Sequence, residues 1–208
     1  MPKKKLGILL SGRGSNFEAI ADNVEKGVLD AEIAIVISNV ADARGLEMAR
    51  RRNLNTCFVD PRGKSRDVYD REVVALLNKN KVDLICLAGY MRILSSFFVQ
   101  QFPCRILNIH PALLPAFKGL DAQRQALEFG AKVTGCTVHF VDEGVDSGPI
   151  ILQSSVPVGE DDTEASLSQR ILGEEHRLYS QAIKLVLEGR FKVEGRCVHI
   201  QASTVNAN

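Results

Sequence analysis

The chain has 208 residues, of which 45% are apolar and 25% are charged, and its formal net charge is +1. These are ordinary values for a soluble globular protein, and the length is enough for one good core. The near-neutral charge gives no basic excess typical of nucleic-acid binding and no acidic excess typical of disorder, although one local anion site remains compatible with it.

Short apolar runs alternate with amphipathic segments along the first half of the chain. Strands are expected at residues 6–10, 32–38, 56–59, 84–88 and 106–109, and helices at 41–52, at 66–79 and around Phe17, Ile20 and Val24. Strands that alternate with helices favour a parallel sheet covered on both faces.

The last third of the chain changes character. Residues 134–141 alternate in polarity, 150–158 form a long β-rich run, and 163–187 form a final helix. The sequence therefore predicts an α/β fold with three layers and a doubly wound, mostly parallel sheet of about seven strands, Rossmann-like in its N-terminal half. We expect a single domain over residues 1–208, with 202–208 as a disordered tail.

A glycine-rich turn at residues 11–16 follows the first strand and opens the first helix. Ser15 is expected to cap that helix, with Glu18 completing a capping box. Gly12 and Gly14 let the backbone approach a ligand, and free N–H groups at a helix start favour an anion. Phe17 replaces the third glycine of a dinucleotide fingerprint, so a phosphate monoester is favoured over NAD. The alternative is an ordinary, well-capped turn.

Asn108 and His110 lie two residues apart at the end of a predicted strand, so their side chains share one face. Ligands of open α/β sheets bind at the carboxyl ends of strands. Histidine suits proton transfer near neutral pH, and an asparagine amide can stabilise an oxyanion. Alone, however, such a pair is more often structural than catalytic.

An acidic, glycine-rich loop at residues 142–149 contains Asp146. It follows Thr137 and His139, which share one face of the preceding strand and suggest a cleft lining. A hydrogen-bonded core role is an equally good reading of His139. The segment 89–94 leaves another strand end, and its Met91, Ile93 and Leu94 either form an apolar slot for a flat ring or belong to an ordinary loop.

The cysteines and the apolar runs indicate the cellular compartment. The five cysteines form no C-x-x-C pair, so neither a zinc site nor a disulfide framework is expected. The first apolar run is too short for a signal peptide, and no stretch approaches the ~20 apolar residues of a membrane span. We expect a cytoplasmic protein with no membrane partner.

Residues 11–16, 88–94, 107–115, 135–140 and 142–149, in this order, closely resemble the motifs of the phosphoribosylglycinamide formyltransferases, folate-dependent enzymes of de novo purine synthesis. The similarity runs from about residue 5 to about residue 193. It implies transfer of a formyl group from 10-formyltetrahydrofolate, as cosubstrate, to the amine of glycinamide ribonucleotide in the IMP pathway. It also implies that residues 1–100 handle the nucleotide phosphate and 101–200 handle folate and catalysis, without metal or nucleic acid; monomer and homodimer stay open.

The resemblance also implies residue roles. The catalytic set is Asn108, His110 and Asp146; the nucleotide contacts are Gly14, Ser15, Asn16 and Glu175; the folate contacts are Arg66, Met91, Arg92, Ile93, Leu94, Val141, Asp142, Glu143, Gly144 and Val145. Without the resemblance, Glu175 and Arg66 read as exposed helix charges. Many members carry histidines where this chain has Asp121 and Gln123, so no essential histidine is expected there.

In the expected mechanism, Asn108 and protonated His110 donate hydrogen bonds to the oxyanion that forms at the formyl carbon. Asp146 raises the pKa of His110 and moves protons between the two nitrogens. Four rivals remain. A formyltetrahydrofolate hydrolase is expected to carry an extra N-terminal domain, and a methionyl-tRNA formyltransferase a C-terminal extension. A silent nucleotide-binding module would bind without turnover, and a dehydrogenase is disfavoured by Phe17.

Overall fold

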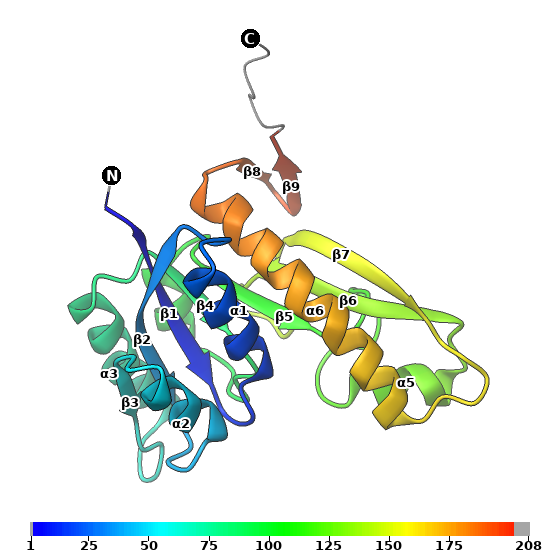
Figure 1. Ribbon diagram of the computed structural model, residues 1–208, viewed down its shortest axis with the longest axis horizontal. Helices are drawn as coiled ribbons and strands as arrows, with labels where there is room; N and C mark the ends of the chain where they lie inside the picture. Colours follow the sequence, from blue (N-terminus) through cyan, green and yellow to red (C-terminus); the bar gives the residue numbers. More distant parts are fainter. Residues whose placement is uncertain (1, 202–208) are drawn as a thin grey trace.

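The structure, a computed structural model, describes residues 2–201, which form one nine-stranded sheet flanked by helices (Figure 1). The strands are β1 (Lys4–Leu10), β2 (Ala31–Ser38), β3 (Thr56–Phe58), β4 (Leu84–Leu87), β5 (Ile106–His110), β6 (Val133–Phe140), β7 (Ile150–Pro157), β8 (Phe191–Glu194) and β9 (Cys197–Ile200). The helices are α1 (Ser15–Glu25), α2 (Arg44–Arg51), α3 (Arg66–Lys79), α4 (Ser96–Gln101), α5 (Ala122–Phe129) and α6 (Glu164–Leu187).

The strand order is β3-β2-β1-β4-β5-β6-β7-β9-β8. Strands β1 to β5 run parallel to one another, whereas β6 is antiparallel to both β5 and β7. The expected mostly parallel α/β sheet is therefore confirmed. The expected strand number was too low, because β8 and β9 have only four residues each and form a hairpin: β8 alternates in polarity over too short a run to be counted as a strand, and β9 does not alternate in burial.

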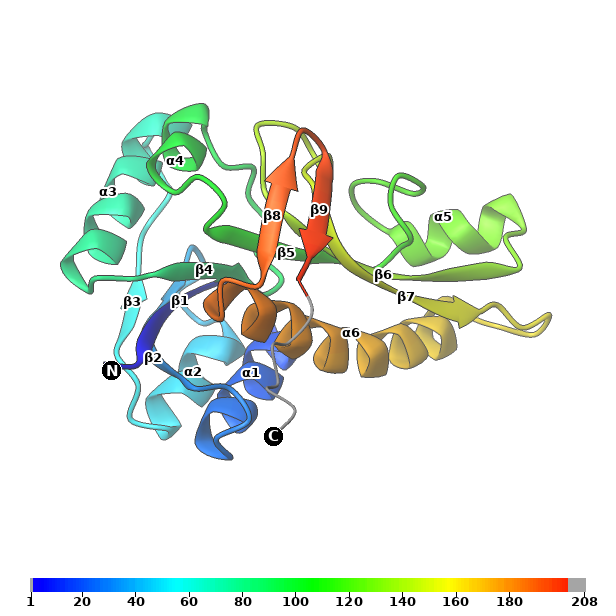
Figure 2. The same cartoon turned by 90° about the horizontal axis from the view of Figure 1, so that it is seen from above.

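Helices cover both faces of the sheet (Figure 2). Leu6, Ile8 and Leu10 of β1 pack toward α1, α2 and α6, while Leu9 packs toward α3 and α4. This period of two is the signature of a strand buried on both faces. The three layers follow directly from it.

Two short helices, α4 and α5, were not expected from the sequence. Helix α4 has only six residues and α5 only eight, so neither offers enough turns for a clear apolar period. Helix α5 lies near the start of α6, and an ion pair of 3.2 Å between Arg124 of α5 and Glu164 of α6 joins the two helices. The connections after β4 and β5 therefore carry more structure than expected.

The longest helix, α6, fastens two neighbouring strands. The buried hydroxyl of Tyr179 lies 3.0 Å from the carbonyl oxygen of Leu87 and 2.9 Å from that of Leu107. Its single hydrogen is shared between β4 and β5, close to their carboxyl ends. Among residues 2–201, no helix is long and apolar enough to cross a membrane. The expected tail, 202–208, lies outside the described residues.

Candidate active site

The candidate residues gather where β1, β4 and β5 end. Strand order reverses between β1 and β4, and such a switch point is where open α/β sheets bind ligands. Ser11, after β1, joins the neighbouring loops: its N–H donates to the Gly89 carbonyl at 3.0 Å, and its hydroxyl oxygen accepts from Met91 N–H at 2.8 Å. The turn at 11–16 and the segment 89–94 are therefore directly connected.

Gly14 sets the shape of the turn before α1. Its φ is +79°, and a Cβ atom there would stand 2.7 Å from the Cα of Gly45. The predicted capping box was wrong: Gly14 is itself the N-cap residue, and no side chain caps the helix. Glu18 N–H makes the first intrahelical bond, to the Gly14 carbonyl at 2.8 Å. The N–H groups before it have no helical acceptor and can donate to an anion.

Glu175 lies beside this turn, inside the protein. Its residue is only 7% exposed, and its carboxylate accepts a hydrogen bond of 2.9 Å from the Asn16 amide. Burial raises the pKa of Glu175 to about 7, although the Asn16 hydrogen bond opposes this shift. Asn16 Oδ1 is buried without a partner among residues 2–201. The helix pattern alone suggested an exposed glutamate, whereas the fold brings Glu175 to the nucleotide-phosphate candidates.

Asn108, His110 and Asp146 meet in one half-buried cluster. The Asn108 amide nitrogen lies 3.3 Å from Asp146 Oδ1, and His110 Nδ1 lies 3.3 Å from Asp146 Oδ2. Gly119 N–H donates to the same carboxylate at 2.9 Å. Asp146 adopts a φ of +46°, and its side chain is only 12% exposed. One strand, β5, and two loops thus supply one hydrogen-bonded set.

His110 has acceptors at both ring nitrogens. Its Nε2 lies 2.7 Å from the carbonyl oxygen of Phe117, and its Nδ1 faces Asp146. The imidazolium satisfies both contacts, whereas a neutral ring satisfies only one. Burial nevertheless lowers the pKa of His110, and this outweighs the raising effects of Asp146 and the Phe117 carbonyl. Asp146 thus raises the pKa of His110 as expected, but the net shift is downward because the ring is buried more deeply than the sequence could show.

Asp146 has the opposite balance. Burial alone would raise its pKa, but the hydrogen bond from Gly119 N–H and the charge of protonated His110 lower it. The carboxylate is therefore ionised at neutral pH. The contacts with Phe117 and Gly119 were not anticipated, and backbone groups of a loop leave no signal of their own in the sequence.

His139 joins the cluster through the strand register. Residue 139 of β6 stands opposite Asn108 of β5. His139 Nδ1 lies 2.8 Å from the Phe140 carbonyl, so this nitrogen donates and leaves Nε2 as an acceptor. The Asn108 amide nitrogen lies 3.2 Å from that Nε2. His139 is thus both buried and hydrogen-bonded to a catalytic candidate.

Thr137, opposite His110 in the same register, is fully buried and fully hydrogen-bonded. Its hydroxyl donates to the Ala112 carbonyl at 2.7 Å and accepts from Leu114 N–H at 3.0 Å and from the Gln153 amide at 2.9 Å. These contacts use its one donor and both acceptor positions. Thr137 therefore secures the turn after β5 and does not line an open cleft.

The folate candidates lie on three elements: the segment after β4, the start of α3 and the loop after β6. Met91 and Ile93 are exposed, Leu94 is buried, and the Arg92 guanidinium stacks on the Tyr69 ring with its Cζ 4.2 Å from the ring centroid. Arg66, one helical turn before Tyr69, is exposed. In the loop after β6, Val141 packs partly into the core, Val145 is exposed, and Glu143 accepts from Ser96 at 2.9 Å and Gln100 at 3.1 Å.

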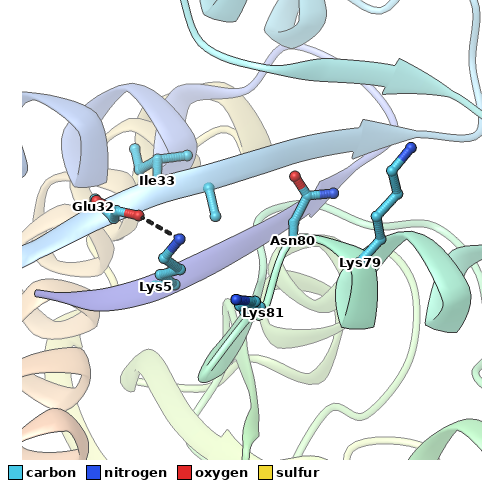
Figure 3. Close-up of a pocket in the computed structure, with 7 residues that line it drawn as sticks. Lys5, Glu32, Ile33, Lys79, Asn80 and Lys81 are labelled. Atoms are coloured by element: carbon cyan, nitrogen blue, oxygen red, sulfur yellow. Dashed lines mark ion pairs between the residues drawn. The ribbon is translucent and has the colours of Figure 1, made fainter. Parts of the chain in front are cut away.

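Two open depressions lie away from these residues. One, of about 460 Å³, is lined by Lys5, Glu32, Ile33, Ala34, Lys79, Asn80 and Lys81 (Figure 3). It lies at the amino ends of β1 and β2, the opposite edge of the sheet, and its Lys5–Glu32 ion pair spans 3.1 Å. The other follows the groove between α1 and α6. Within the described part of the chain, no group of three or more His, Cys, Asp or Glu residues could hold a metal.

Comparison with known proteins adds independent information. The sequence model of the formyl transferase family matches residues 4–183, a span that ends before β8. A trifunctional purine biosynthetic protein adenosine-3 of Homo sapiens is 47% identical over 188 residues, which make up 90% of this chain and 19% of the human protein. The phosphoribosylglycinamide formyltransferase of Escherichia coli is 42% identical, over 89% of this chain and 88% of that protein.

A solved structure is also similar. The crystal structure of glycinamide ribonucleotide transformylase 1 from Symbiobacterium toebii matches with a TM-score of 0.94 at 53% identity, covering 96% of this chain and 95% of that chain. The chain thus spans nearly the whole of these bacterial proteins, but only 14–19% of the length of the trifunctional relatives.

Proposed function

The chain belongs to the formyl transferase family, and on that premise we propose that it transfers a formyl group from 10-formyltetrahydrofolate to the amine of glycinamide ribonucleotide. The observation that carries the proposal is the hydrogen-bonded set of Asn108, His110 and Asp146 at the carboxyl edge of the sheet. The relatives described as phosphoribosylglycinamide formyltransferases support the choice of substrates.

The turn at 11–16 is the proposed phosphate site. Free N–H groups around Gly14, Ser15 and Asn16 would hold the ribose 5′-phosphate at the positive end of α1. Glu175 would contact the rest of the nucleotide, and its partner Asn16 has a buried oxygen that still lacks a donor among residues 2–201. An unsatisfied buried acceptor is costly, so a ligand hydroxyl or amine donating to it would be favoured.

The folate is proposed to lie between two segments, 91–94 and 141–145, with Arg66 nearby. Exposed Met91 and Ile93 offer an apolar surface to a flat ring. Arg92 Nε is buried without an acceptor in the described residues, which suits a ligand oxygen or ring nitrogen. On this view residues 1–100 and 101–200 are the two halves of a single domain. The bound cosubstrate supplies an electrophilic formyl carbon attached to nitrogen.

The catalytic set would act on the charge that develops during transfer. The substrate amine forms a bond to the formyl carbon, the bond to folate nitrogen breaks, and one proton passes from the amine to the departing nitrogen. Asn108 and His110 would donate to the oxygen that becomes negative, where one oriented donor contributes about 3–4 kcal/mol. Asp146 would stabilise the imidazolium and relay the proton.

Both donors have partners in the present arrangement. His110 Nε2 contacts the Phe117 carbonyl, and the Asn108 amide contacts His139 and Asp146. The reaction therefore requires substrate oxygen to replace one partner of each donor. His139 is proposed to hold the Asn108 amide in register until that exchange.

Acceptor dependence tests the function. Purified protein with 10-formyltetrahydrofolate should release tetrahydrofolate only when glycinamide ribonucleotide is added. Release in buffer alone would identify a hydrolase, and release dependent on methionyl-tRNA would identify a tRNA formyltransferase. No release with any of the three, despite tight nucleotide binding, would identify a silent binding module and refute the proposal.

A further inference from the structure

The β8–β9 hairpin is attached to both ends of the loop that carries Asp146. At one end, the Phe191 ring of β8 packs on the Phe140 ring, with 5.2 Å between centroids. At the other end, Cys197 of β9 pairs with Ile150. Figure 2 shows the hairpin standing against β7 beside that loop. The hairpin thus contacts the residue on each side of segment 141–149.

Arg196, in the turn of the hairpin, reaches the loop itself. Its Nη2 donates a hydrogen bond to the carbonyl oxygen of Ser147, the residue after Asp146. A guanidinium on a carbonyl is a charge-assisted contact, stronger than a neutral one. The only other side chain of the hairpin that resembles it, Arg190 at the base, donates to the Gln201 carbonyl and does not reach the loop.

Inside the loop, the Ser147 hydroxyl donates to Asp142 at 2.6 Å, whereas the Ser147 carbonyl has Arg196 as its donor. Asp146 holds a left-handed φ of +46°, a conformation that is uncommon for residues other than glycine and that aspartate tolerates better than most. On the N-terminal side, Glu143 is held by Ser96 and Gln100 of α4. On the C-terminal side, the Gly148 backbone lies so close to the Phe140 carbonyl that a Cβ atom would stand 1.8 Å from it. Arg196 fixes the carbonyl between that close contact and Asp146.

We propose that Arg196 is a positioning residue: it holds the Ser147 carbonyl and thereby keeps the Asp146 carboxylate on His110 and Asn108. The role of that carboxylate in turnover rests on the proposed function, whereas its placement beside His110 does not. The hairpin is on this account a brace for the catalytic loop, and not merely an edge of the sheet.

The direct test follows the ring of His110. The chain has four histidines, so their proton resonances can be assigned by single substitutions and followed against pH. Because Asp146 opposes the burial that lowers the pKa of His110, loss of its alignment in Arg196→Ala lowers that pKa further. Arg196→Lys, which keeps a charged donor, restores much of the wild-type titration. Arg190→Ala, the matched control in the same hairpin, leaves it unchanged.

Kinetics supply the second readout. Arg196→Ala should lower kcat about tenfold, the order expected when one charge-assisted contact is lost, while KM for glycinamide ribonucleotide stays within about twofold. The thermal midpoint should match that of Arg190→Ala, which separates positioning from general loss of the hairpin.

The outcomes separate the two proposals. An unchanged His110 titration in folded Arg196→Ala overturns the positioning role. Equal effects of Arg190→Ala and Arg196→Ala on His110 also overturn it, in favour of a purely structural hairpin. A shifted His110 titration in a protein that transfers no formyl group to any acceptor would keep Arg196 as a brace and reject the proposed function.

Discussion

Replacing Asp146 by asparagine removes one charge and keeps the shape of the side chain. The carboxylate touches four groups: Gly119 N–H at 2.9 Å, the Asn108 amide at 3.3 Å, His110 Nδ1 at 3.3 Å and His139 Nε2 at 3.6 Å. An amide oxygen still accepts from Gly119, so the loop should stay closed. The imidazolium of His110 loses its counter-charge.

The size of the effect follows from that lost charge. Asp146 raises the pKa of His110 against the effect of burial, so the variant has an even lower pKa there and fewer rings carry the proton needed for donation. Loss of one oriented donor to a developing oxyanion amounts to about 3–4 kcal/mol, so Asp146→Asn should reduce kcat by about 10²–10³ at neutral pH. KM for the nucleotide should change little, because the phosphate turn is separate.

The assay is steady-state formyl transfer, measured across pH with both substrates varied. Asp121→Asn is the control: Asp121 is exposed, is the N-cap residue of α5 and makes no hydrogen bond to His110, Asp146 or Phe117 in the described residues, so its kcat should equal that of wild type. The double variant His110→Ala/Asp146→Asn should be about as slow as the worse single variant, because the two side chains act as a unit. A kcat for Asp146→Asn within about threefold of wild type, or strict additivity in the double variant, would refute the reasoning.

Three further predictions concern the frame around the site. Gly14→Ala forces a Cβ atom to 2.7 Å from Gly45 at a φ of +79°. It should lower the free energy of unfolding, measured in urea, by about 1–3 kcal/mol and raise KM for the nucleotide. Gly27→Ala, also at positive φ but facing open space, should leave that KM unchanged. Tyr179→Phe removes the donor shared by two strand carbonyls and should destabilise the fold by about 1–3 kcal/mol in the same measurement. The pKa of Glu175 is raised from 4.5 to about 7, so the folded state binds the extra proton and its stability falls as pH rises between these values. Glu175→Gln should abolish that fall and be more stable than wild type by about 3 kcal/mol at pH 8 but not at pH 4, and equal pH profiles would contradict the buried assignment.

Much of the fold could be predicted because its signals are local. The apolar run at β4 and the span of α3, which Ser65 caps, were predicted within a residue. The turn before α1 could not be predicted correctly, since the choice of Gly14 as N-cap depends on a contact with α2, far away in the sequence. The periodic signal of β8 covers only four residues and β9 has none, and the place of the hairpin depends on the pairing of β9 with β7.

The candidate site shows the same division. A period of two put Asn108 and His110 on one face, and likewise Thr137 and His139, but only the register of β5 with β6 reveals which pairs face each other. In that register His139 contacts Asn108, whereas the hydroxyl of Thr137 makes all its hydrogen bonds with other residues, among them the turn after β5. The burial of Glu175 and His110 depends on packing from several elements, so the direction of their pKa shifts was beyond the reach of the sequence.

The carbonyl oxygen of Phe117 competes with any bound ligand for the hydrogen-bonding position at His110 Nε2. Any oxygen that approaches His110 Nε2 must displace a backbone acceptor already seated at 2.7 Å. Observed affinity then equals intrinsic affinity multiplied by the fraction of molecules whose residue 117 has withdrawn. A compound whose carbonyl oxygen accepts from His110 Nε2 would therefore measure this fraction. A substitution that loosens residue 117 would lower the Kd of such a compound, although the compound gains no new contact.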